Sequence, residues 1–326
     1  EQEKPSVAIT SAPPANARLT NETVAMNGTA ADNSGLSAVE WRVINSLGVT
    51  AWMPASGTNQ WTLTTSDLMF GTNTIEVRSW DTWANVSTIV SRRYVRLAPL
   101  TVGVNGCGNV SSGFLGASFR DPGTTVTVTA TPCGNALFAG WTGGLVNNGA
   151  RISFLMPTGL VLQAHFVTNP FTALRGSYAG LFYETNVVSQ QSAGFVSVLT
   201  TAKGTYSGRL RTGSRSYAFS GRLSLDGLAT NSVRRGGTNL PLRLELNLNL
   251  GQSTEWLAGR VIDANWTADL TAYRAVFHAR TNLAPYRGRY TLLLPANGVP
   301  GTPDGDGHGA VTVSAGGSAR LSGSLA

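Results

Sequence analysis

The sequence has few of the side chains on which most catalytic and metal sites depend. It holds three histidines and two cysteines among 326 residues, and charged residues make up only 13% of it. His165, His278 and His308 lack the spacing of zinc ligands. There is no Gly-x-Ser-x-Gly nucleophile motif and no phosphate-binding Gly-Lys-Ser/Thr loop. We therefore expect a protein that is not an enzyme and that needs no cofactor.

Long hydrophobic runs and lysine are also scarce. No run approaches the ~20 apolar residues that span a bilayer, so no transmembrane segment is expected. Lys4 and Lys203 are the only lysines, so the net charge of +7 comes from arginine. The arginines are scattered, and only Arg92-Arg93 and Arg234-Arg235 are adjacent. Without a basic stripe, specific nucleic-acid binding is not expected.

Glycine and hydrophobic residues are abundant. The 38 glycines, with 42% hydrophobic residues, indicate β-domains joined by tight turns rather than a disordered chain. The length predicts two or three domains, each with its own core.

Residues 1–97 have the pattern of an Ig-like β-sandwich. Val39, Trp41 and Val43 alternate with polar residues, as in a half-buried strand. The segments 21–35 and 71–87 resemble bacterial Ig-like repeats of secreted proteins, in which Asp-x-x-Gly-Asn is usual; here Ala84 takes the place of the glycine. Four oxygen-bearing residues on loops could either form turns, which we favour, or bind Ca²⁺. They are Asp32, Asn33, Asp81 and Asn85.

Residues 98–168 form a second module that contains both cysteines. A Cys107–Cys133 disulfide is expected in an oxidising compartment, with two free buried thiols as the alternative. The segments 123–132, 138–143 and 164–166 resemble the divergent internalin-type B-repeat of bacterial surface proteins, which implies a small β-grasp-like fold. His165 alternates with the apolar residues of its strand, so we expect it at the surface.

Residues 169–326 contain an internal repeat. Gly176–Tyr183 is echoed by 288–294, and 194–210 by 309–325. Between the copies, leucines at every second position from Leu242 to Leu250 predict a strand. We expect an antiparallel barrel or meander of two related halves. The Gly-x-Tyr-x-Gly and Tyr-Ser-Gly-x-Leu marks resemble a domain of large secreted proteins from planctomycete- and verrucomicrobia-type bacteria.

The second copy is shorter than the first. It stops where the turn after its third strand would begin, so we expect an open β-edge at Leu321–Leu325. Either the natural chain continues past Ala326, or a neighbouring molecule completes the sheet.

One acidic loop is the best candidate for a metal site. Asp304 and Asp306 alternate with glycines beside His308, which could suit Ca²⁺. The loop lacks the later glutamate of an EF-hand, so we favour a hairpin turn.

These patterns predict a bacterial extracellular or cell-surface protein with a structural or adhesive role. Its partners would be other copies of itself or other surface proteins. The first alternative is a carbohydrate-binding region of a larger secreted enzyme, with Trp52, Trp80 and Trp83 stacking on sugar rings. The second is a hydrolase, since a glycosidase needs only two carboxylates. Its candidates are Glu184, Glu245 and Glu255. The sequence does not identify the ligand.

Overall fold

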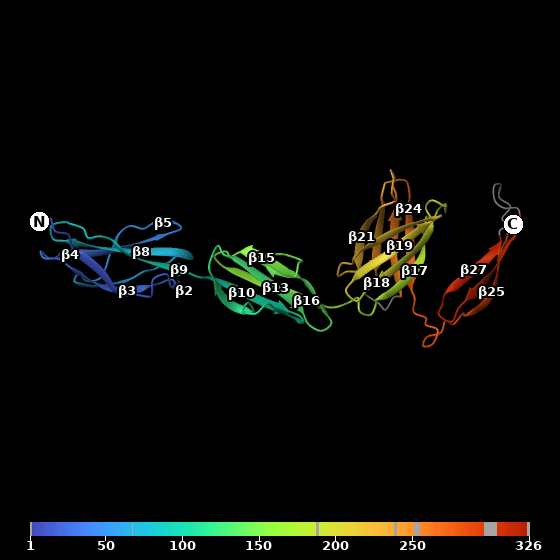
Figure 1. Cartoon of the computed structure of the whole chain (residues 1–326), viewed down its shortest axis with the longest axis horizontal. Helices are drawn as coiled ribbons and strands as arrows, with labels where there is room; N and C mark the ends of the chain where they lie inside the picture. The colour runs from blue at the N-terminus through green and yellow to red at the C-terminus, as the bar shows by residue number, and fades with distance from the viewer. Residues whose placement is uncertain are drawn as a thin grey trace. The chain divides into compact units, whose positions relative to one another are not determined.

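The computed structural model describes residues 2–66, 68–186, 189–237, 240–250, 255–296 and 305–324, and every regular element in them is a β-strand. The all-β prediction is therefore confirmed. None of the described elements is a helix long and apolar enough to cross a membrane. The chain divides into two compact units, Glu1–Thr168 and Asn169–Ala326 (Figure 1).

The first part of unit 1 is a sandwich of two sheets. One sheet has the order β1-β3-β7, and the other has the order β2-β9-β8-β4-β5, with β6 also paired to β4. The strands are β1 (Ser6–Ser11), β2 (Arg18–Leu19), β3 (Ala25–Ala31), β4 (Leu36–Asn45), β5 (Gly48–Val49), β6 (Met53–Pro54), β7 (Gln60–Thr64), β8 (Gly71–Asp81) and β9 (Val90–Arg96). Val39, Trp41 and Val43 are buried together with Trp61 and Tyr94, as the alternation in β4 predicts.

The second part of unit 1 also contains two sheets. Their orders are β12-β10-β16-β14 and β11-β13-β15, and the central β10–β16 pair is parallel. The strands are β10 (Ala98–Asn105), β11 (Gly108–Val110), β12 (Gly116–Arg120), β13 (Thr125–Pro132), β14 (Ala136–Gly143), β15 (Arg151–Leu155) and β16 (Leu160–Thr168). Val126, Val128 and Ala130 face a core that contains Trp141. His165 lies on the other side of β16, where its Nε2 is 2.7 Å from Thr142 Oγ1.

Unit 2 begins with an eight-stranded antiparallel barrel in the order β20-β19-β18-β17-β24-β23-β22-β21 (Figure 1). The strands are β17 (Gly176–Tyr183), β18 (Gly194–Thr200), β19 (Thr205–Thr212), β20 (Arg215–Arg222), β21 (Leu228–Val233), β22 (Leu242–Leu248), β23 (Trp256–Ile262) and β24 (Thr267–Arg274). Leu242, Leu244, Leu246 and Leu248 are all buried in its interior, which confirms the clearest alternation in the sequence.

The barrel is nearly closed. Its two end strands, β20 and β21, follow one another in the chain and share no backbone ladder in the described residues. Side chains cross the seam instead: Asn231 Nδ2 donates to Ser220 O at 2.8 Å, and the Tyr206 hydroxyl donates to Asn231 Oδ1. These side-chain bonds join the two end strands across the seam.

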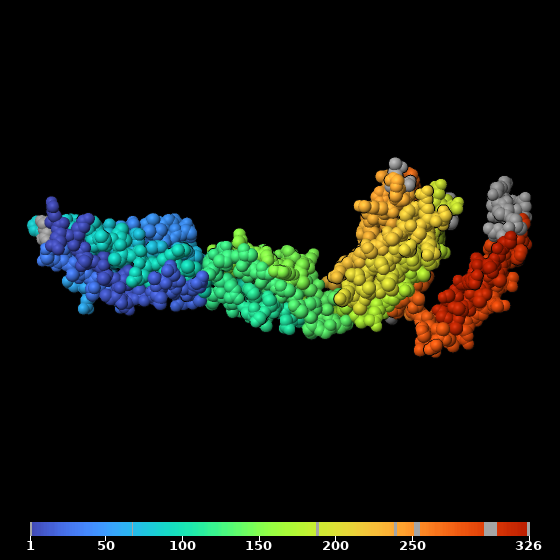
Figure 2. All heavy atoms as spheres, viewed as in Figure 1, coloured from blue at the N-terminus to red at the C-terminus, as the bar shows by residue number. Residues whose placement is uncertain are grey.

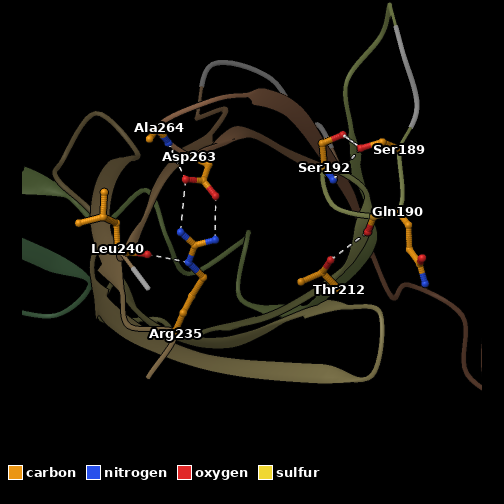
Figure 3. Close-up of polar contacts among 8 residues, drawn as sticks. All are labelled: Ser189, Gln190, Ser192, Thr212, Arg235, Leu240, Asp263 and Ala264. Carbon is orange, nitrogen blue, oxygen red and sulfur yellow. Dashed lines mark hydrogen bonds and ion pairs between the residues drawn. The ribbon is translucent and has the colours of Figure 1, made fainter. Parts of the chain in front are cut away.

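Polar contacts fix the loops at one end of the barrel (Figure 3). Arg235 Nη1 lies 2.7 Å from Asp263 Oδ2, and Arg235 Nε donates to Leu240 O at 2.6 Å. Ser189 and Ser192 share a hydroxyl contact of 2.7 Å. One member of the Arg234-Arg235 pair is thus held in an ion pair.

The second copy of the repeat forms a separate three-stranded sheet, ordered β25-β26-β27. Its strands are β25 (Gly288–Leu294), β26 (Gly307–Val313) and β27 (Ala319–Ser324). The predicted barrel is confirmed for residues 176–274, but the two related halves are not strands of one sheet. The physical reason is that β24 pairs with the edge of β17 that β18 leaves free. The second copy therefore has no edge of β17 to join.

Candidate interaction surface

The β25–β27 sheet has one apolar face and one mostly polar face. Six apolar side chains share a face because they occupy alternate positions on antiparallel strands. They are Tyr290, Leu292, Leu294, Val311, Val313 and Leu321. Tyr290 is 46% exposed and Leu321 is 62% exposed, so this face is not a buried core in the described residues. Figure 2 shows the atoms of these strands as a narrow band coloured orange to red.

Both edges of this sheet are unpaired within the described part of the chain. β26 lies in the centre, and the outer edges of β25 and β27 have no strand beside them there. Leu321 lies on β27, at the edge predicted from the sequence, whereas Leu325 falls outside the described residues. An uncovered apolar face between two open edges is the usual signature of a strand-accepting surface.

In the predicted metal loop, the carboxylate of Asp306 is hydrogen-bonded to the backbone. Asp306 Oδ1 accepts a hydrogen bond from Ala296 N at 2.8 Å, while Asp304 falls outside the described residues. Nowhere in the described ranges do three histidine, cysteine or acidic side chains gather as metal ligands.

The acidic residues on the Ig-like loops form turns. Asp32 Oδ2 accepts from Ser34 N at 2.7 Å, and buried Asp81 accepts from the backbone amides of Trp83 and Asn85, both at 2.8 Å. Burial alone would raise the pKa of Asp81, but the hydrogen bonds from the Asn85 side chain and from these amides outweigh it and lower that pKa. These contacts fit the favoured interpretation, turn formation.

The tryptophans predicted to stack on sugars lie on the Ig-like sandwich and contact arginines. The Arg42 and Arg78 guanidinium carbons lie 4.4 and 4.0 Å from the centre of the Trp52 ring. Trp80 Nε1 donates to Glu40 at 2.8 Å. Trp83 is 64% exposed and is not part of this stack. The three predicted residues therefore do not form one flat platform, and their role in sugar binding stays a prediction.

A different aromatic pair lies on the outside of the barrel. Trp256 on β23 and Tyr273 on β24 are directly opposite in the strand register, and both are exposed. Tyr273 is also opposite Ala179, at the edge of a shallow groove of about 690 Å³ that continues past Ser197 to Arg209. The sequence did hold a signal for Tyr273, because it alternates with the buried Leu270 and Ala272.

Of the carboxylates considered for hydrolysis, Glu184 lies directly after β17, and Glu245 and Glu255 contact arginines. Glu245 pairs with Arg243 at 2.6 Å and Arg260 at 2.8 Å, and Glu255 lies 3.8 Å from Arg274. These contacts are those of exposed ion pairs on a barrel wall.

The predicted disulfide is present. Cys107 and Cys133 are bonded, with their Cα atoms 5.4 Å apart, and they join the start of β11 to the end of β13. The closed loop spans 26 residues, which corresponds to about 3.5 kcal/mol of stabilisation in the chain-entropy model. The bond holds a module that has no helix in its described residues.

Comparison with known families agrees with these modules. Residues 5–77 match the bacterial Ig domain family, and residues 98–170 match the divergent InlB B-repeat domain family. Both domain types are typical of bacterial surface and secreted proteins, so these matches and the disulfide indicate an extracellular or surface location. No curated protein matches the chain.

Solved structures give only distant similarities. A crystal structure of an engineered protein is 18% identical over 28% of this chain and 20% of its own length, with a TM-score of 0.23. The fibronectin(III)-like modules of Clostridium thermocellum CbhA are 10% identical over 67% of this chain and 94% of theirs, with a TM-score of 0.22. A cycloalternan-degrading enzyme from Trueperella pyogenes is 10% identical over 81% of this chain and 30% of its own, with a TM-score of 0.23. At these scores the similarities carry no argument about this chain.

Proposed function

We propose that the protein is a non-catalytic structural or adhesive component of the bacterial surface or its secreted material, and that it assembles through the β25–β27 sheet. The observation that carries this proposal is the apolar face of that sheet, which is uncovered and bounded by two unpaired edges within the residues that the structure describes. An added strand would gain backbone hydrogen bonds at an edge and apolar burial on the face.

The other polar clusters support a structural role. Glu245, considered for hydrolysis, is held by arginines, and Asp81, considered as a Ca²⁺ ligand, is held by backbone amides. Such contacts hold loops and strands in place, which supports the proposed structural role.

The direct test is the mass of the full chain by light scattering over a concentration series, with electron micrographs of the same samples. We expect mass to rise with concentration. Leu321→Arg should abolish the rise, because it places a charge on the apolar face. Leu293→Arg is the matched control, since Leu293 is 58% exposed but lies on the opposite face of the same sheet. A strict monomer at all concentrations, or equal effects of the two variants, would reject the proposal.

A second candidate function, polysaccharide binding, is favoured by the exposed Trp256–Tyr273 pair. Neighbouring aromatic rings on a flat strand surface can stack on sugar rings, and Arg209 in the adjoining groove could pair with an acidic sugar. Tryptophan fluorescence should then shift on titration with polysaccharides. Tyr273→Ala should remove the shift, and Trp83→Ala should preserve it. If Trp83→Ala removes the shift and Tyr273→Ala preserves it, the sugar-binding site lies on the Ig-like sandwich instead.

A further inference from the structure

One row of outward-facing side chains crosses six strands of the barrel wall. Residues directly opposite one another on antiparallel strands share a face of the sheet, so the register connects them from strand to strand. The row on β23, β24, β17, β18, β19 and β20 consists of Trp256, Tyr273, Ala179, Ser197, Arg209 and Ala218. At about 4.8 Å per strand, Arg209 lies roughly 19 Å along the wall from Trp256.

The middle of this row is the floor of the shallow groove, because its side chains are small. Ala179 and Ser197 separate the larger side chains of Tyr273 and Arg209. The neighbouring row on the same face also lines the groove, and it consists of Ser177, Leu199, Ser207 and Ser220. An extended ligand can therefore lie across the strands, with the aromatic pair at one end and the arginine near the other.

The groove offers hydroxyl groups to such a ligand. Four of the residues that line it are Ser177, Ser197, Ser207 and Ser220. Within the part of the chain that the structure describes, none of these four hydroxyls has a hydrogen-bond partner. A serine hydroxyl both donates and accepts, so each of the four can bind a hydroxyl group of a sugar.

The two halves of the barrel wall differ in charge. Strands β17–β20 contain no aspartate or glutamate, and their four exposed arginines, without an ion pair among the described residues, are Arg209, Arg211, Arg215 and Arg222. On β22 and β23, by contrast, Glu245 pairs with Arg243 and Arg260. Asp269 of β24 lies opposite Arg260. The half of the wall that holds the groove therefore attracts anions more strongly than the other half.

We infer that this wall binds an acidic polysaccharide laid across the strands. A sugar ring stacks on Trp256 and Tyr273, the serines of the groove bind sugar hydroxyls, and Arg209 pairs with a carboxylate or sulfate group. The inference rests on the second candidate function, polysaccharide binding, and names the class of its ligand.

A single-stranded nucleic acid is the other polyanion that arginines and aromatic rings bind. Proteins that hold it use a series of rings on which successive bases stack. Here two rings lie at one end of the row, and small or hydroxyl-bearing side chains line the groove between them and Arg209. This arrangement favours a polysaccharide.

The test compares polymers that share a backbone and differ in charge. Binding of the full chain to polygalacturonate and to its neutral methyl ester is measured by tryptophan fluorescence and calorimetry. Dextran sulfate and dextran form a second pair. We expect the charged member of at least one pair to bind on the order of 10-fold more tightly than its neutral partner.

Substitutions locate the contact with the charged group. Arg209→Gln should weaken binding of the charged polymer on the order of 10-fold and leave binding of its neutral partner unchanged. Arg243→Gln is the matched control, because it removes the same charge from an exposed side chain outside the groove. Arg209→Lys keeps the charge and should retain most of the affinity, which separates a lost contact from a lost fold. Tyr273→Ala should weaken binding of both members of a pair.

Three results would overturn the inference. Equal binding of charged and neutral polymers, lost in Tyr273→Ala, would keep polysaccharide binding but reject an acidic ligand. Equal effects of Arg209→Gln and Arg243→Gln, or single-stranded DNA bound at least as tightly as the polysaccharides, would assign the binding to a general attraction for polyanions. Absence of binding to all four polymers would reject the second candidate function as well.

Discussion

At the scale of single residues, Ala84 shows how a turn survives without its usual glycine. Its φ is +67°, in the left-handed region where an alanine Cβ is crowded. The turn is kept because Asp81 accepts hydrogen bonds from the Trp83 and Asn85 amides on either side. These hydrogen bonds outweigh the backbone strain at Ala84, but the strain still lowers the stability of the folded protein.

Ala84→Gly should relieve that strain. We expect a gain of up to about 1 kcal/mol in the free energy of unfolding, since the lost Cβ strain is offset in part by the greater freedom of glycine when unfolded. Urea denaturation would measure the change in the free energy of unfolding, and hydrogen exchange at the β8 amides would measure it locally. Ala84→Val is the control and should destabilise; a glycine variant that is less stable than the wild type would show that the turn is not strained.

Asp81 should make stability depend on pH. Its pKa is lowered in the folded state, so its contribution is present above the unfolded value of about 3.9 and is lost as pH falls through the folded pKa. Asp81→Asn should therefore be less stable than the wild type at pH 7, and the difference should shrink once the pH drops below about 4. Denaturation midpoints at both pH values would check this. A difference that does not change with pH would assign the effect to shape instead of charge.

Some contacts of single residues could be predicted from the sequence, and others could not. The Asp81 turn and the Cys107–Cys133 bond could be predicted because turn chemistry and cysteine pairing are local or nearly exclusive signals. The contact of Trp52 with Arg42 and Arg78 could not, because it depends on which residues face each other across β4 and β8 and on the pairing of β5 and β6 with β4.

At the scale of elements, period-two alternation predicted individual strands well. β22 and β4 lie where their buried side chains indicated. The pairing of the two repeat copies was harder, because alternation fixes a strand's face but says nothing of which sheet it joins. That choice depended on β24 returning to pair with β17, a contact between distant segments.

Equivalent strands in unlike surroundings allow a matched comparison. Tyr178→Ala should cost about 3 kcal/mol or more, because the ring is buried in the barrel. Tyr290→Ala should cost less than about 1 kcal/mol, because its ring is 46% exposed. Hydrogen exchange at the β18 and β26 amides would report the two local stabilities.

Tyrosine-to-phenylalanine variants at the same two positions are the control. Each removes one hydroxyl bond to a backbone carbonyl. The bond is buried at Tyr178 and exposed at Tyr290, so Tyr178→Phe should cost about 1 kcal/mol and Tyr290→Phe should cost less than Tyr290→Ala. Equal costs for the two alanine variants would mean that the Tyr290 face is covered in solution.

At the scale of the whole molecule, charge and apolar surface act in opposite directions on assembly. Each copy carries a net charge of +7, so copies repel one another at low ionic strength. The proposed contact is apolar and backbone-mediated, with Leu321 and Val311 on the joining face, and holds no acidic residue on that face.

Salt should therefore strengthen assembly. Raising it from ~0.1 to ~1 M shortens the Debye length from ~10 to ~3 Å and removes the repulsion, while sulfate also favours apolar burial. Light scattering at fixed protein concentration should show a larger mass in sodium sulfate than in sodium chloride of equal ionic strength, and the smallest mass at low salt. Leu321→Arg should stay monomeric in all three. If assemblies instead dissolve as salt rises, arginine-to-carboxylate pairing holds the copies together, and the contact lies on a charged surface of the molecule, away from β25–β27.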